Sequence, residues 1–146
     1  MRAILVPELI CSDLDQSLRF YLELLGFQIL YDRPEHRFAF LDRDGAQIML
    51  VQPLTRDRLW PKAELTPPFG RGVNLEIQVS DVDKLHSAVL ATGMDCFLPL
   101  EERWYRRDDY EIGVRQFAAQ DPDGYLIRLS QKLGTRPATP WRERAC

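Results

Sequence analysis

The chain has 146 residues, of which 45% are hydrophobic and 28% charged, and its formal net charge is −3. These values are typical of one soluble globular domain with a sizeable core. The small negative charge disfavours nucleic acid and anionic membranes as partners, and no apolar run approaches the roughly 20 residues of a membrane helix. The N-terminus shows no signal-like segment. Three widely spaced cysteines without a CxxC motif predict free thiols in a reducing cytoplasm.

The chain contains an internal repeat in which a short strand runs into a helix. Residues 8–15, ELICSDLD, return as residues 76–83, EIQVSDVD. In each copy a Ser-Asp pair supplies candidate helix N-caps, and Gly26 or Gly93 is placed to end the helix. Apolar residues follow helical spacing between these signals: Leu14, Leu18, Tyr21, Leu22 and Leu25 in the first copy, and Val82, Leu85, Val89 and Leu90 in the second.

Apolar runs separated by turn-forming residues follow each helix and predict about three further strands per copy. The resulting unit, a strand, a helix and three strands, occurs twice. We therefore predict an α/β (α+β) fold built of two paired βαβββ modules in a single domain. The expected boundaries are 1–134 for the domain, 3–53 for the first module, 54–72 for the connection, 73–134 for the second module and 135–146 for a disordered tail.

Several local sequences, in their order along the chain, resemble one known family. They are Val6-Pro7, Phe20-Tyr21 followed by Leu25-Gly26-Phe27, Phe38-Ala39-Phe40, and Gln116-Phe117 followed by DPDGYLIR at residues 121–128. With the repeated unit, they resemble the vicinal oxygen chelate (glyoxalase-like) superfamily and, within it, the bleomycin-resistance-type branch. The resemblance covers roughly residues 3–133 and implies that the two modules pair their curved sheets into an open cup.

Metal-dependent members of this superfamily take ligands from the first and last strand of each module. By resemblance, the corresponding positions here are Val6 and Asn74 on the first strands, and Met49 and Arg128 on the last strands. Valine has no lone pair, methionine offers a soft thioether and arginine a permanent cation, whereas divalent metals prefer carboxylates and imidazoles. We therefore expect no metal and no other cofactor.

The strands predict which side chains face the open side of the sheet. In residues 74–79, NLEIQV, every second side chain is polar, and strand geometry sends the two sets to opposite faces. The apolar set is expected to pack on the second helix, so Asn74, Glu76 and Arg128 would share the open face. That face could instead be merely solvated, and Glu8–Arg128 or Glu76–Arg128 pairs could be purely structural. A shifted register would turn Glu8 or Glu76 inward as a metal ligand.

Two aromatic residues are candidate ligand contacts. Phe38 matches a groove phenylalanine of the bleomycin-resistance branch, although core packing is the ordinary role of a strand phenylalanine. Trp104 stands in a polar stretch and suits stacking on a planar ligand; a solvated loop with one tucked ring is the alternative. Where the family carries a further groove tryptophan, this chain has Gly113.

The sequence favours ligand binding without catalysis. There is no GxSxG motif or phosphate loop, and no serine has a nearby histidine as a base. The resemblance implies a homodimer that sequesters a bleomycin-like glycopeptide antibiotic or a similar small molecule. Acidic side chains would favour a cationic ligand, whereas Arg128 would favour a carboxylate. The expected ligand contacts are Glu8, Phe38, Met49, Asn74, Glu76, Trp104 and Arg128.

Two other functions remain open from the sequence. One is a metal-dependent glyoxalase- or dioxygenase-like enzyme of the same superfamily. The other is an interaction protein without a small ligand, in which substitutions at Glu76 and Arg128 affect stability alone.

Overall fold

The computed structural model describes residues 1–56, 59, 61 and 63–139. The chain forms two compact units: the first comprises Met1–Val73 and Gln120–Tyr125, and the second Asn74–Ala119 and Leu126–Cys146. The boundary at Val73 lies close to the predicted start of the second module, but residues 120–125 join the first unit. Within the described residues, no helix is long and apolar enough to cross a membrane.

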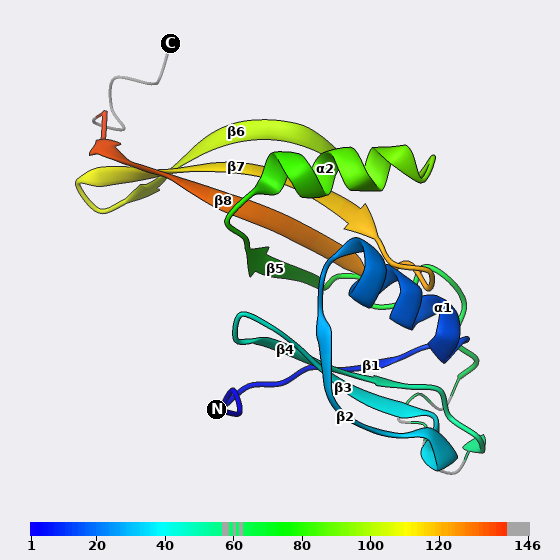
Figure 1. Ribbon diagram of the computed structural model, residues 1–146. Coiled ribbons are helices and arrows are strands. Elements are labelled where there is room, and N and C mark those ends of the chain that lie inside the picture. Colours follow the sequence, from blue (N-terminus) through cyan, green and yellow to red (C-terminus); the bar gives the residue numbers. More distant parts are fainter. Residues whose placement is uncertain (57–58, 60, 62, 140–146) are drawn as a thin grey trace. The chain divides into compact units, whose positions relative to one another are not determined.

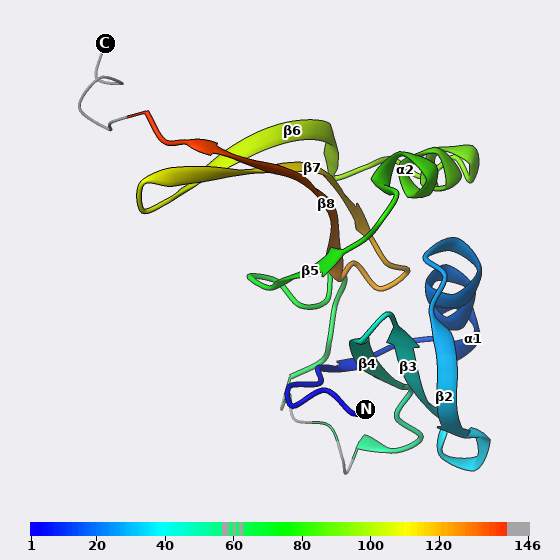
Figure 2. The same ribbon diagram turned by 60° about the vertical axis from the view of Figure 1, so that its left-hand side comes forward.

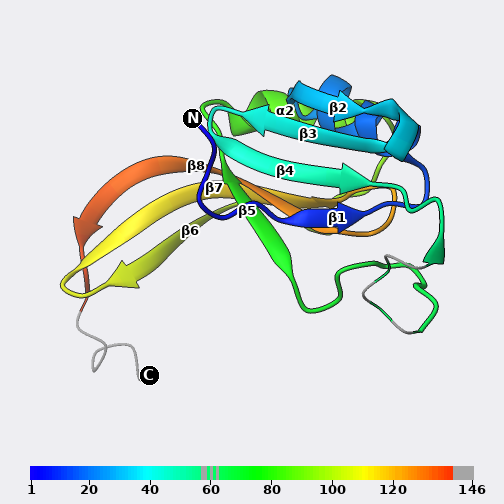
Figure 3. The same cartoon turned by 90° about the horizontal axis from the view of Figure 1, so that it is seen from below.

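The first unit is a four-stranded mixed sheet with a helix on one face. Its strands lie in the order β1-β4-β3-β2, with β1 parallel to β4 and the other pairs antiparallel (Figure 3). The helix packs on the sheet face that carries the buried side chains of Leu9, Leu41 and Leu50. The elements are β1 (Glu8–Ile10), α1 (Leu14–Leu18), the π-helix η1 (Arg19–Leu24), β2 (Gln28–Arg33), the 3₁₀ turn η2 (Pro34–His36), β3 (Phe38–Arg43) and β4 (Ala46–Val51).

The second unit repeats this topology with longer strands. Its order is β5-β8-β7-β6, with β5 parallel to β8 and β6 antiparallel to β7. The β6–β7 hairpin and the end of β8 extend beyond α2 as a three-stranded arm (Figures 1 and 2). The elements are β5 (Asn74–Gln78), α2 (Val82–Ala91), β6 (Leu98–Arg107), β7 (Tyr110–Gln120) and β8 (Leu126–Pro137).

These two sheets, each with one helix between its first and second strand, confirm the predicted fold class and the duplicated βαβββ unit. Strand β8 continues to Pro137 and so includes the first three residues of the segment expected to be a tail. Residues 140–146 lie outside the described residues.

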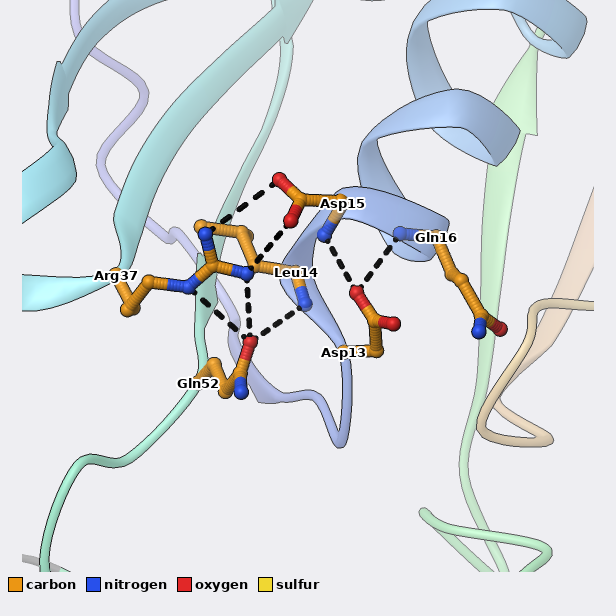
Figure 4. A network of polar contacts seen from close by, with 6 residues as sticks. All are labelled: Asp13, Leu14, Asp15, Gln16, Arg37 and Gln52. Carbon is orange, nitrogen blue, oxygen red and sulfur yellow. Dashed lines mark hydrogen bonds and ion pairs between the residues drawn. The ribbon is translucent and has the colours of Figure 1, made fainter.

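Polar side chains hold the start of α1 against the strands (Figure 4). Asp13 is the N-cap and accepts hydrogen bonds from the backbone N–H groups two and three residues later. Gln52, just after β4, accepts a hydrogen bond from the Leu14 N–H at 2.9 Å. Arg37 donates to the same Gln52 oxygen at 2.9 Å and pairs with Asp15 at 3.0 Å. One side-chain amide, 38 residues later in the chain and just after β4, therefore ties the helix start to the sheet.

The helices differ from the predicted regular spacing in two places. The first helix widens into the π-helix η1, so Phe20 and Tyr21 are buried side by side while Leu22 is only half-buried. In α2, Leu90 is 50% exposed although it was predicted to face the core. The buried residues of α2 are Val82, Leu85 and Val89, and the helix ends one residue after Leu90.

The turn that joins β7 to β8 is anchored inside the first unit. The buried Tyr21 hydroxyl donates to the Asp121 carboxylate at 2.8 Å. Asp121 also accepts from the backbone N–H groups of Asp123 and Tyr125. Tyr125 in turn donates to the carbonyl oxygen of Ile10 at 2.9 Å. A buried carboxylate with three donors thus organises both the turn and its contact with the helix.

Replacing Tyr21 with phenylalanine removes one of these donors. We expect the free energy of unfolding to fall by about 1–3 kcal/mol at neutral pH, because a buried charged acceptor loses a partner. Burial raises the pKa of Asp121 and the Tyr21 hydrogen bond opposes that rise, so the pKa is higher still in the variant. The loss therefore grows as pH rises through the Asp121 pKa and is smallest in acid.

Urea unfolding across the acidic and neutral range measures this loss. Tyr31→Phe is the matched control, since that side chain is 44% exposed and the substitution should change stability little. Equal losses in acid and at neutral pH would contradict the role assigned to the carboxylate.

Candidate functional site

The parallel pairing of β5 with β8 places a carboxylate beside a guanidinium. Glu76 lies directly opposite Arg128 in the register, and the two side chains form an ion pair at 2.9 Å. The hydroxyl of Ser130 donates to the other oxygen of Glu76 at 2.8 Å. Glu76 is 46% exposed and Arg128 28% exposed. The pair is therefore ordered by its neighbours and still open to solvent.

The ion pair continues into a polar row across β7 and β6. Arg128 donates to the side-chain oxygen of Gln116 at 3.5 Å. The amide nitrogen of Gln116 donates to the Tyr105 hydroxyl at 2.8 Å and to Glu101 at 3.2 Å. Gln116 itself is 1% exposed. Its amide is held in one orientation by a donor on one side and two acceptors on the other, which gives the face a fixed pattern of hydrogen-bonding groups.

This row, which we call the polar row, consists of Glu76, Ser130, Arg128, Gln116, Glu101 and Tyr105. It combines carboxylates, a guanidinium, a hydroxyl, an amide and one half-exposed aromatic ring. Such a surface can recognise a polar organic molecule by several directed hydrogen bonds. Among the described residues, the row contains no histidine and no cysteine, and its one serine donates to the Glu76 carboxylate that also pairs with Arg128.

In the first unit the corresponding cross-strand row is aromatic. Glu8 lies opposite Met49, Met49 opposite Phe40, and Phe40 opposite Tyr31. The rings of Tyr31 and Phe40 are stacked with their centroids 5.0 Å apart. Phe38 lies two residues before Phe40 on β3 and therefore on the same face. We call this face, opposite the helix, the aromatic face.

Phe38 and Phe40 are 5% and 1% exposed, although they lie on the sheet face turned away from the helix. Part of that burial comes from two arginines. Arg33 lies over the Phe38 ring at 4.0 Å and Arg2 over the Phe40 ring at 5.3 Å, measured from the guanidinium carbon to the ring centroid. Both distances are within the range of cation–π attraction.

The structure brings together some of the predicted contacts and separates others. Glu76 joins Arg128 in the polar row, and Glu8 and Met49 share the aromatic face with Phe38. Asn74 is exposed at the start of β5, two residues before Glu76 and therefore on the same face, where it lies opposite Leu126.

Trp104 lies on the other face of the β6–β7 ribbon from the polar row. It is opposite Gly113, whose missing Cβ leaves room for the ring: an added Cβ would lie 2.7 Å from it. The neighbouring Arg115 on that face pairs with Asp83 of α2 at 2.8 Å, which identifies it as the helix side. Arg136 covers the Trp104 ring at 4.1 Å.

The four positions that the resemblance assigns to metal ligands do not fit a divalent metal. Val6 precedes β1, which begins at Glu8, so it lies outside the strand on which it was predicted. Met49 offers only a thioether and Asn74 one amide oxygen, and the fourth position holds the cation of Arg128. In the described ranges, no group of three or more His, Cys, Asp or Glu side chains is placed to hold a metal ion.

Comparison with known proteins gives the family. The model of the Glyoxalase/Bleomycin resistance protein/Dioxygenase superfamily matches residues 3–129. The chain belongs to this superfamily. This confirms the resemblance seen in the sequence motifs.

Proteins similar to this chain include a bleomycin resistance protein, and its structural neighbours include a lyase. The bleomycin resistance protein of Geobacillus stearothermophilus is 26% identical over 137 residues, covering 88% of this chain and 96% of that protein. The crystal structure of TioX from Micromonospora sp. ML1 is 25% identical with a TM-score of 0.66, covering 90% and 99%. Lactoylglutathione lyase from Agrobacterium tumefaciens, at 20% identity and a TM-score of 0.58 over 88% and 92%, shares the fold. The shared fold therefore does not determine the activity of this chain, which depends on its own side chains.

Sequence reasoning missed several residues of both rows. Gln116, Glu101 and Tyr105 belong to the polar row, and Phe40 and Tyr31 to the aromatic face. The two-residue period of a strand would have predicted Phe40, because it lies two residues after Phe38 and therefore on the same face. The pairing of β6 with β7 was needed for Tyr105, because its neighbour Trp104 has the more conspicuous side chain and points the other way.

Beyond the polar row, the arm contains an ion pair in which a half-exposed arginine covers a buried carboxylate. Arg136 donates to Glu111 at 2.7 Å, and the Glu111 side chain is only 1% exposed. We expect Arg136→Ala to lower the free energy of unfolding by about 1.5–3 kcal/mol, because a buried carboxylate loses a charged donor. Arg103→Ala is the matched control: its pair with Glu101 is more exposed, and such pairs contribute about 0–1 kcal/mol. Equally small losses for the two variants, measured by urea unfolding, would contradict the buried role.

Proposed function

We propose that the protein binds a small organic molecule without a metal ion, and that the polar row of the second unit makes contact with it. A bleomycin-like glycopeptide is the proposed ligand class, and sequestration rather than catalysis the proposed action. The cytoplasm is the proposed compartment, supported by the free thiols of Cys11 and Cys96.

The observation that carries this proposal is the pairing of Arg128 with Glu76. Arg128 occupies the last-strand position at which the superfamily resemblance implies a metal ligand. Its guanidinium is a fixed cation bound to a carboxylate at 2.9 Å, so the position repels a metal ion and supplies hydrogen-bond donors instead. The adjoining Glu76 keeps half of its surface open and offers an acceptor to a cationic or hydroxyl-bearing ligand.

The 26% identity to a bleomycin resistance protein supports the ligand class. A glycopeptide presents amides, hydroxyls and a cationic group, and the polar row offers acceptors and donors for each of these. Glu76 is the side chain proposed for the cation, because Arg128 pairs with one of its oxygens and the other accepts only from the neutral hydroxyl of Ser130.

Calorimetric titration of the metal-stripped protein with metal-free bleomycin tests the proposal. We expect saturable binding, weakened about tenfold or more by Glu76→Ala, since a hydrogen bond to a charged group contributes roughly 1.5–3 kcal/mol. Glu23→Ala, an exposed glutamate of η1, is the matched control and should leave the affinity unchanged.

Identical affinities for the wild type and Glu76→Ala would remove the polar row from the ligand site. Binding or turnover that appears only after a divalent metal is restored, and that a chelator abolishes, would favour the metal-dependent enzyme instead.

A homodimer is also part of the proposal. Edge strand β2 supports it, since Ile29, Leu30 and Tyr31 are 39%, 54% and 44% exposed there, and an open edge with apolar side chains suits association with a second chain. We expect sedimentation equilibrium to give a dimer that Leu30→Lys weakens. Leu90→Lys, at a leucine 50% exposed on α2, should not. A monomeric wild type at micromolar concentration would contradict this assembly.

A further inference from the structure

The first three residues of the chain lie on the aromatic face of the first unit, beside the β3–β4 hairpin (Figures 1 and 3). A single side-chain amide, that of Gln47, holds both ends of this tripeptide. Its oxygen accepts from the Ala3 N–H at 2.7 Å, and its nitrogen donates to the Met1 carbonyl at 3.0 Å. Gln47 is 6% exposed and also donates to Asp42 at 2.8 Å. The amide is thus oriented to accept from one backbone N–H group and to donate to one backbone carbonyl.

Arg2, between the two hydrogen-bonded residues, places its guanidinium over Phe40 at 5.3 Å. The adjacent Phe38 carries a second guanidinium, that of Arg33, at 4.0 Å. The same face therefore accommodates a planar cation at two neighbouring rings. Glu8 lies in the same cross-strand row as Phe40, two strands away, about 10 Å along the sheet, and adds a carboxylate that attracts cations.

The two cations differ in how firmly they are held. Arg33 belongs to strand β2 and is fixed by the ladder to β3. Arg2 is exposed and precedes the first strand. Ile4 and Leu5, which follow the tripeptide, are 108% and 86% exposed. Residues 1–3 are therefore attached through Gln47 and Phe40 and have no ladder that would have to break for them to leave.

We propose that residues 1–3 are a replaceable occupant of this face, and that the ligand that replaces them is a peptide-like amide carrying a planar cation. The replacing ligand would reuse both hydrogen bonds of Gln47 and the ring of Phe40. This inference deepens the proposed function, because it names the chemistry of the bound molecule, and it rests on the premise that the protein binds a small organic ligand.

The affinity of an added ligand depends on how strongly residues 1–3 occupy the aromatic face. The cation–π contact of a solvent-exposed cation such as Arg2 contributes roughly a two- to fivefold factor in affinity. Because the tripeptide is part of the chain, its local concentration at the face is high, of millimolar order for a short flexible link. A free ligand competes against that concentration, so weakening the internal occupant should strengthen external binding by a comparable factor.

The test uses acetyl-Met-Arg-Ala-amide, a free copy of the tripeptide without its charged ends. It is titrated into the full-length protein and into the full-length Arg2→Ala variant. Chemical-shift changes of the Gln47 side-chain NH₂ and the Phe40 backbone amide report binding. We expect affinity for Arg2→Ala to exceed that for the wild type by about two- to fivefold. Arg19→Ala, at an exposed arginine of η1, is the matched control and should bind as the wild type does.

A second peptide, with glutamine in place of the arginine, isolates the cation and should bind Arg2→Ala more weakly than the arginine peptide does. Equal affinities of the arginine peptide for the wild type and Arg2→Ala would overturn the proposal. So would equal affinities of the two peptides for Arg2→Ala, or no shift change at millimolar peptide. Bleomycin plays no part in this test, so its outcome is separate from the calorimetric result at Glu76.

Discussion

Parallel pairing between the first and last strand of each unit is the constraint on which the proposed sites depend. It places Glu8 beside Met49 in the first unit and Glu76 beside Arg128 in the second. These are equivalent positions of the repeat, and only the side chains differ. The first unit therefore presents a carboxylate next to a thioether and aromatic rings, whereas the second presents a carboxylate bound to a guanidinium. The same backbone arrangement thus occurs twice, with different side-chain chemistry in each unit.

Much of the fold was accessible from the sequence because its signals are local. The Ser-Asp caps, the glycines after each helix and the alternation in residues 74–79 depend on neighbours along the chain. They predicted Asp13 and Asp81 as candidate caps, and the structure shows both. The face shared by Glu76 and Arg128 followed from the same alternation. The π-helix was not predicted, because the burial of Tyr21 beside Phe20 depends on a distant partner, Asp121.

The candidate site was less accessible, since its members meet across strands. Alternation alone could place Trp104 and Tyr105 on opposite faces, but only the pairing with β7 decides which of them accompanies Gln116. Likewise, Gln47 has no sequence signal that ties it to residues 1–3, which are 44 and 46 positions away. Contacts of that kind follow from strand register and from the path of the terminus, and neither is encoded in a local pattern.

The turn at residues 121–125 has a consequence for biosynthesis. Its partners in the first unit are 100 to 115 residues earlier in the chain. At a translation rate of about 5–20 residues per second, roughly 3–10 s separate the synthesis of Val73 from that of Tyr125. During that interval the nascent first unit has a helix whose Tyr21 hydroxyl lacks its carboxylate and a strand whose Ile10 carbonyl lacks its donor. The first unit can therefore form these hydrogen bonds only after most of the second unit has left the ribosome.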